Sequence, residues 1–175
     1  MSFWLERGVL SSLKIKDGAK VLELACGDGF NTKHFYSNKA KSVHAFDFDK
    51  NAICHANKFN NSENIKYFVE DIRTCDFIGT YDNIIFDAAI EHFNEEEIKN
   101  ILTKIKDSLN FNGILSGYTI IERGDKSHHL HEYEFKSKED LESILKPYFS
   151  NIEIIHSKSK ENNGHRENLY FFASN

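Results

Sequence analysis

Short apolar runs alternate with helix-length segments along this chain, and this alternation is the feature that most constrains its fold. Residues 20–25 form an apolar run between glycines, as expected for a buried strand. Similar strand-like runs follow at residues 42–47, 64–70, 81–87 and 113–121. An amphipathic helix is expected over residues 3–13, where Leu5, Val9 and Leu13 recur at four-residue steps. The alternation predicts an α/β fold, with a mostly parallel sheet covered on both faces.

Two later helices carry a capping signal at their start. Asn94 is followed by Glu97, and Ser137 by Asp140, so that a side-chain oxygen can cap the first turn and an acid favours it. The second helix is expected to stop at Pro147. The first is expected to bury a stripe made of Ile98, Ile101, Leu102, Ile105 and Leu109.

The end of the chain contains two more strand-like runs. They cover residues 151–156 and 168–173, and the polar stretch 157–167 separates them. We expect this stretch to be a hairpin-like link, which makes the last strands antiparallel.

Composition limits the classes of protein to consider. The chain has 175 residues, 40% hydrophobic and 28% charged, which is typical of a folded domain and not of a disordered or fibrous protein. No linker composition interrupts it, so we expect one domain, with an N-terminal helix in residues 1–18 and a core in residues 19–175. The net charge of −5 gives no general attraction for nucleic acid or anionic lipid. We therefore expect no nucleic-acid or membrane partner, and a monomer or homodimer.

The sequence also predicts the cellular location of the protein. No apolar run is long enough to cross a bilayer, and the first residues lack the order of a signal peptide. The three cysteines, Cys26, Cys54 and Cys75, show no CxxC spacing, which argues against a disulfide framework and a zinc ribbon. We expect a cytoplasmic protein with reduced thiols.

A glycine-rich turn follows the first strand. Residues 23–29 read Glu-Leu-Ala-Cys-Gly-Asp-Gly, and such a turn lets backbone amides approach a nucleotide-like ligand. Thr32 occupies the place of the third glycine in the dinucleotide fingerprint, which disfavours NAD and FAD. Asp47 closes the second strand, where a carboxylate can accept hydrogen bonds from both hydroxyls of a ribose. The ligand is therefore expected to contain a nucleoside.

Four features occur in order: the glycine turn, Asp47, the end of the third strand at residues 70–72, and the exit of the fourth strand at residues 87–93. Because these four features occur in this order, the chain resembles the class I S-adenosylmethionine-dependent methyltransferases over almost its whole length. The resemblance implies a Rossmann-like, doubly wound, mostly parallel seven-stranded sheet with an antiparallel last strand. It also implies S-adenosylmethionine as cofactor and S-adenosylhomocysteine as product.

The resemblance assigns cofactor contacts residue by residue. Asp47 matches the ribose-binding acid and Phe48 lies beside the adenine, while Asp71 and Ile72 match the pair at the adenine edge. Asp87 and Ala88 fall beneath the sulfonium and methyl group. The methionine part is expected over the first motif, of which we single out Glu23, Ala25, Cys26, Gly27, Asp28 and Gly29.

Methyl transfer from a sulfonium needs an in-line lone pair held close to the methyl group, with water excluded. A base is required only when the acceptor is protonated, and His92 is the candidate because it follows the fourth strand. Glu91 is placed to orient His92 or to bind substrate. The alternative is that His92 is only a packed residue at a helix entry, as in many members of the family.

A histidine run, His128 to His131, follows the fifth strand. We interpret it as a loop near the substrate mouth, with His128 and His131 as substrate-binding candidates. The other interpretation is a metal site with Glu91 and His92, as in a metal-dependent RNA 3'-end methyltransferase family that shows Glu-x-x-Glu-His here. Ala88 stands where the first glutamate would fall, so we expect no metal ligands.

The sequence thus predicts a methyltransferase that acts on an oxygen or nitrogen of a small polar metabolite. The alternatives are the metal-assisted RNA 3'-end methyltransferase and a nucleoside- or dinucleotide-binding protein without methyl transfer. Acceptor specificity lies in loops whose residue types are generic here.

Overall fold

The computed structural model describes residues 3–121, 130–161 and 164–175. They form a seven-stranded sheet in the order β3-β2-β1-β4-β5-β7-β6. Strand β7 is antiparallel to its neighbours β5 and β6, whereas the other neighbouring pairs are parallel. This confirms the predicted doubly wound sheet with an antiparallel last strand. The strands are β1 (Ala19–Leu24), β2 (Ala40–Asp47), β3 (Ile65–Val69), β4 (Tyr81–Asp87), β5 (Leu109–Ile120), β6 (Asn151–Glu161) and β7 (Gly164–Ser174).

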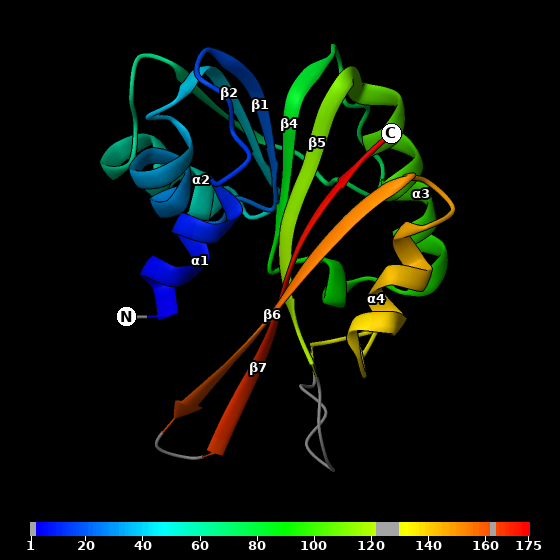
Figure 1. Ribbon diagram of the computed structural model, residues 1–175. Helices are drawn as coiled ribbons and strands as arrows, with labels where there is room; N and C mark the ends of the chain where they lie inside the picture. Colours follow the sequence, from blue (N-terminus) through cyan, green and yellow to red (C-terminus); the bar gives the residue numbers. More distant parts are fainter. Residues whose placement is uncertain (1–2, 122–129, 162–163) are drawn as a thin grey trace.

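Helices cover both faces of this sheet (Figure 1). The α-helices are α1 (Phe3–Ser11), α2 (Lys50–Phe59), α3 (Glu95–Ser108) and α4 (Lys138–Leu145). A π-helical turn, Thr32–Tyr36, follows β1, and a 3-10 turn, Ile90–His92, follows β4. Helices α1 and α2 lie on one face, and α3 and α4 lie on the other. None of the described helices is long and apolar enough to cross a membrane.

The core is divided between the two faces. Successive residues of a strand point to opposite sides, so Val21 packs in the cluster with Tyr36 and Ile53, whereas Leu22 packs in the cluster with Ile98. Both strand residues are fully buried. Burial on both faces explains why β1 and β4 read as nearly continuous apolar runs rather than as alternating ones.

The predicted helix caps are present. The side chain of Asn94 accepts hydrogen bonds from the amides of Glu96 and Glu97, and the carboxylate of Glu97 accepts one from the amide of Asn94. The hydroxyl of Ser137 accepts a hydrogen bond from the amide of Asp140 at 3.2 Å. Helix α3 ends at Ser108, so the prediction that Leu109 belongs to its buried stripe is wrong. Leu109 has extended dihedrals and pairs with Tyr81 as the first residue of β5.

We expected the polar stretch 157–167 to be a hairpin-like link. The structure shows that most of it belongs to the two strands themselves. Strands β6 and β7 run through it, and their ladder continues to the pair Glu161 and Gly164. Backbone pairing between antiparallel neighbours does not require apolar side chains, which is why a search for apolar runs missed these strand residues. The hairpin therefore projects well beyond the rest of the sheet (Figure 1).

Candidate active site

A pocket of about 450 Å³ lies at the carboxyl ends of β1, β2, β3 and β4. This is the edge at which open α/β sheets bind their ligands. The pocket brings together seven of the site residues expected from the sequence: Ala25, Asp47, Phe48, Asp71, Ile72, Ala88 and His92. Glu70, Arg73, Ala89, Phe93 and Leu130 complete the lining. Glu23, Cys26, Gly27, Asp28 and Gly29 lie in β1 and its turn and do not line this pocket.

Asp47 connects the glycine turn with the start of α2. Its Oδ2 accepts a hydrogen bond from the amide of Gly27 at 2.7 Å, and its Oδ1 accepts one from the amide of Asp49 at 2.8 Å. Ala25 and Gly27 have φ values of 57° and 56°, so the chain turns sharply after β1. The carboxylate at the end of β2 therefore fixes the turn whose amides are expected to face the cofactor.

Gly29 is held where only a glycine fits. Its φ is 75°, and a Cβ atom added there would lie 2.5 Å from the hydroxyl oxygen of Tyr67. That hydroxyl donates to the carbonyl of Asn60 at 2.7 Å and cannot easily move away. Gly29 therefore allows the close approach of the turn to β3.

Glu23 is buried beneath the turn. The hydroxyl of Thr32 donates to Glu23 Oε2 at 2.5 Å. Burial raises the pKa of Glu23 to about 8, although the hydrogen bond from Thr32 opposes this shift. Burial likewise raises the pKa of the Cys26 thiol, so this cysteine stays protonated at neutral pH. Thr32, noted in the sequence only as a missing glycine, is thus a partner of the buried acid.

Asp71 is held by a residue that the sequence analysis missed. The guanidinium of Arg73 contacts both carboxylate oxygens of Asp71, with Nε at 3.0 Å from Oδ1 and Nη2 at 2.7 Å from Oδ2. These hydrogen bonds lower the pKa of Asp71. Both residues line the pocket, so the expected adenine edge carries an ion pair and not a lone acid.

Asp87 faces α1 and is almost fully buried. Its Oδ2 accepts hydrogen bonds from Arg7 Nε at 2.6 Å and from the hydroxyl of Tyr36 at 3.1 Å, and its Oδ1 accepts one from Ser11 at 2.8 Å. Burial lowers the pKa of Arg7, but the charge and hydrogen bond of Asp87, together with Tyr36 and Tyr118, outweigh burial and raise the pKa. No local pattern in the sequence indicates these three partners, because they come from other elements. The side chain of Asp87 thus anchors α1, whereas Ala88 lines the pocket.

Glu91, His92 and His131 lie together beside the pocket. One ligand atom from each lies within 4.8 Å of the others. Glu91 is buried and its Oε2 accepts a hydrogen bond from the hydroxyl of Thr119 at 3.0 Å. Burial raises the pKa of Glu91. His128, the other predicted substrate-binding histidine, lies outside the described residues.

The imidazole of His92 is fixed by a backbone carbonyl. His92 Nδ1 lies 2.9 Å from the carbonyl oxygen of Leu130. A carbonyl only accepts hydrogen bonds, so Nδ1 carries a proton, and in the neutral ring Nε2 carries the lone pair. His92 and Leu130 both line the pocket.

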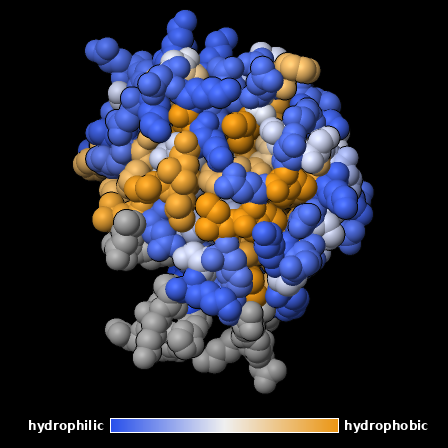
Figure 2. All heavy atoms as spheres, viewed as in Figure 1, coloured by the Kyte–Doolittle hydropathy of each residue, from blue (hydrophilic) through white to orange (hydrophobic). Residues whose placement is uncertain are grey.

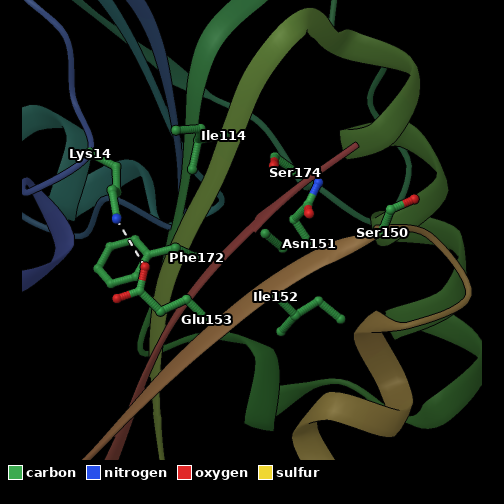
Figure 3. A pocket seen from close by; sticks show the side chains of 9 residues that line it. Lys14, Ile114, Ser150, Asn151, Ile152, Glu153, Phe172 and Ser174 are labelled. Carbon is green, nitrogen blue, oxygen red and sulfur yellow. Dashed lines mark ion pairs between the residues drawn. The ribbon is translucent and has the colours of Figure 1, made fainter.

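Another hollow lies at β5, β6 and β7, away from the pocket described above. Figure 3 shows Lys14 and Glu153 facing each other across it, 2.9 Å apart, and the ammonium of Lys14 lies 5.3 Å from the ring centre of Phe172. Ile114 and Ile152 also line it, and hydrophobic residues gather in the middle of the face drawn in Figure 2. The charged side chains of this hollow, Lys14 and Glu153, already pair with each other. We therefore place the active site in the pocket at the carboxyl ends of β1 to β4.

This fold, with its glycine turn and pocket at the carboxyl edge, defines a class I methyltransferase domain. The sequence matches the family described as "Methyltransferase domain" over residues 21–113. The chain belongs to this family, the class I S-adenosylmethionine-dependent methyltransferases, which use S-adenosylmethionine as cofactor.

Individual relatives agree with this class. The chain is 28% identical to malonyl-[acyl-carrier protein] O-methyltransferase of Bacillus anthracis over 142 residues, which cover 78% of this chain and 52% of that protein. It is 30% identical to (S)-coclaurine N-methyltransferase of Thalictrum flavum subsp. glaucum over 106 residues, which cover 58% of this chain and 29% of that protein. The chain therefore spans about half, or less, of the length of these relatives.

Solved structures share the fold. TehB from Haemophilus influenzae superposes with a TM-score of 0.71 at 22% identity, covering 94% of this chain and 60% of that chain. N-methyltransferase NodS from Bradyrhizobium japonicum WM9, in complex with S-adenosyl-L-homocysteine, gives a TM-score of 0.74 at 16% identity, covering 98% of this chain and 85% of that chain. At these identities, the similarity establishes the fold alone.

Proposed function

We propose that this chain transfers a methyl group from S-adenosylmethionine to an oxygen or nitrogen of a small polar metabolite. The observation that carries this proposal is the pocket where Asp47, Asp71 and Ala88 meet. The relatives named above methylate oxygen or nitrogen, according to their names. We further propose that residues 19–175 form one methyltransferase core, preceded by a helix in residues 1–18.

In this proposal the adenosyl part of the cofactor lies in the pocket. Asp47 receives the ribose hydroxyls while its carboxylate keeps its bonds to the turn, as a carboxylate has room for several donors. Phe48, exposed by 73%, offers its ring to the adenine, and Asp71 with Ile72 meets the adenine edge. The methionine part extends along residues 23–29 toward Asp87 and Ala88.

The acceptor approaches from the side of His92. The in-line geometry requires its lone pair to face the methyl group on the side away from sulfur. In the neutral ring, His92 presents the lone pair of Nε2 because Nδ1 donates its proton to the carbonyl of Leu130. We propose that Nε2 accepts the proton of a hydroxyl or ammonium acceptor, and that Glu91, His128 and His131 contact the acceptor.

The direct test is methyl transfer from labelled S-adenosylmethionine into a panel of small metabolites with hydroxyl, carboxyl or amino groups. The proposal predicts label in one chemical class of acceptor and equal formation of S-adenosylhomocysteine. Label in RNA alone would instead favour the RNA 3'-end alternative. Cofactor binding with no transfer to any acceptor would favour a nucleoside-binding protein.

A further inference from the structure

Glu91, His92 and His131 form a set of donors that suits a metal ion better than the sequence suggested. Two residues are neighbours in the turn after β4, whereas His131 comes from the segment before α4. Their ligand atoms lie within 4.8 Å of one another. Two atoms bound tetrahedrally to one ion at about 2.1 Å lie about 3.4 Å apart, so a pair at the limit of 4.8 Å must close by about 1.4 Å. A side-chain rotation supplies such a shift.

The backbone tethers the third residue to the other two. The carbonyl of Glu91 accepts hydrogen bonds from the amides of Glu132 at 3.0 Å and Tyr133 at 3.1 Å. The carbonyl of Leu130 holds His92. These three bonds fix the segment on both sides of His131. The rings of His92 and His131 lie edge to face with centres 4.9 Å apart.

Two of the three donors are oriented as metal ligands usually are. Ligating histidines commonly donate their other ring N–H to a carbonyl or carboxylate, and ligating carboxylates are themselves hydrogen-bonded. His92 donates from Nδ1 to the Leu130 carbonyl, which leaves Nε2 for an ion. Glu91 accepts a hydrogen bond from the hydroxyl of Thr119. This hydroxyl is neutral, so it does not balance the charge of the buried carboxylate, whereas a metal cation would.

We propose that Glu91, His92 and His131 bind one divalent transition-metal ion, and that an open position of this ion takes an oxygen of the methyl acceptor. This second clause rests on the methyl transfer proposed above. Two imidazoles and one carboxylate suit zinc, iron or cobalt, whereas magnesium and calcium prefer oxygen ligands. Three protein ligands leave positions open, as in catalytic metal sites. The metal set departs from our expectation of no metal ligands because the third ligand is His131 and not a glutamate at position 88.

The site lies where such an ion would act. His92 and Leu130 line the cofactor pocket together with Ala88 and Ala89. A hydroxyl bound to the ion loses its proton to water more readily. Its oxygen then forms the bond to the methyl carbon while the carbon–sulfur bond breaks, and that electron pair stays on sulfur as a neutral thioether. In the metal-bound protein, Nε2 of His92 is a ligand and not the proton acceptor.

The test is a titration of the full chain, prepared without a histidine tag and stripped by a chelator. Zn²⁺ is added in competition with a chromogenic chelator, without S-adenosylmethionine. We expect one bound Zn²⁺ per chain and at least about tenfold weaker binding in His131→Ala. Thr119→Val, which removes only the hydroxyl that orients Glu91, is expected to weaken binding by about tenfold. His55→Ala removes an exposed histidine of α2 and serves as the matched control with unchanged affinity.

Three results would overturn the proposal: no stoichiometric Zn²⁺, affinity unchanged in His131→Ala, or equal losses in His131→Ala and His55→Ala. Circular dichroism on each variant shows that the fold is kept. Replacement by Co²⁺ gives a second readout, because a visible absorption band from Co²⁺ in the site should disappear in His131→Ala. Titration of the same sample with S-adenosylhomocysteine separates the two proposals. Cofactor binding without metal binding rejects the metal site alone, and metal binding without cofactor binding rejects the proposed function.

Discussion

Arg7 Nε lies 2.6 Å from Oδ2 of Asp87, so a nearly buried ion pair joins α1 to the carboxyl end of β4. The side chains are exposed by only 17% and 2%. Ser11 and Tyr36 bind the same carboxylate. The residue after Asp87 is Ala88, which lines the cofactor pocket. The first helix is thus connected with the strand end on which the methyl group is expected to lie.

Replacing Arg7 with methionine should destabilise the protein. The change leaves the buried carboxylate of Asp87 with neutral donors only, and breaking one side of a buried pair costs about 3 kcal/mol or more. We expect a loss of that size in the free energy of unfolding, measured by urea denaturation.

Lys14→Met supplies the matched control for this prediction. Lys14 and Glu153 form an exposed pair across the hollow in Figure 3, and such pairs contribute less than about 1 kcal/mol. Equal losses in Arg7→Met and Lys14→Met would contradict the anchoring role of Arg7.

Glu23 should make stability depend on pH. In the folded protein its pKa is about 8, whereas the ordinary value of 4.5 applies when the chain unfolds. Between these values the folded state holds one more proton than the unfolded state. The free energy of unfolding should therefore fall as pH rises through this window, by up to about 1.4 kcal/mol per pH unit, and level off above pH 8.

The Glu23→Gln variant isolates this effect because it keeps the shape of the side chain and replaces the carboxyl group with an amide that does not ionise. Urea denaturation of both proteins from about pH 5 to about pH 8 should show that the wild type loses stability relative to the variant. A constant difference across this range would show that the pKa of Glu23 is not raised.

Gly29→Ala should cost more stability than Gly18→Ala. Both glycines have a positive φ, 75° and 79°, so each alanine pays about 1 to 2 kcal/mol for the backbone. A Cβ at Gly29 also displaces Tyr67 from its bond to Asn60, whereas at Gly18 it meets nothing within 4 Å. We expect a loss of about 3 kcal/mol in the free energy of unfolding at Gly29. Similar losses at both positions would contradict the tight approach to β3.

His92→Ala should lower the turnover of methyl transfer by about 10²-fold, because it removes the Nε2 lone pair, which takes the acceptor's proton in the metal-free protein and binds the ion in the metal-bound protein. The affinity for S-adenosylhomocysteine, measured by calorimetry, should stay within about threefold of the wild type, since Asp47 and Asp71 remain. Full turnover in this variant would reduce His92 to a packing residue of the turn after β4.

The alternation of strands and helices was predictable because most of these elements carry a local signal. The caps at Asn94 and Ser137 and the glycine turn act over a few residues, and the family resemblance implied seven strands with the last one antiparallel. The longer hairpin was missed because the ladder between Ser157 and Asn168 continues through polar residues. Leu109 was misassigned because an apolar residue at a helix end suits a helix stripe and a strand start equally well.

Within the site, the long-range partners were not predictable. Arg7 and Asp87 lie 80 positions apart, and nothing near either residue indicates the other. The segment of His131 lies beside His92 because the carbonyl of Leu130 binds the ring of His92 and the carbonyl of Glu91 binds the amides of Glu132 and Tyr133. Arg73 is close in sequence to Asp71, but an exposed arginine two residues after an acid indicates no particular pairing.

Asp47→Asn should weaken the binding of S-adenosylhomocysteine by about 10-fold to 100-fold, because the amide cannot accept at both positions from ribose and from the amides of Gly27 and Asp49. Asp82→Asn is the control. Asp82 accepts from the amide of Lys20 at the opposite edge of the sheet, so cofactor affinity should not change. Equal affinities in the wild type and Asp47→Asn would remove Asp47 from the cofactor site.

Calorimetric titration of the wild-type chain with S-adenosylhomocysteine tests the central claim most directly. The account predicts saturable binding of one molecule per chain at the pocket beyond β1 to β4. A folded sample that shows no saturable binding would contradict the claim that this pocket holds an adenosyl cofactor.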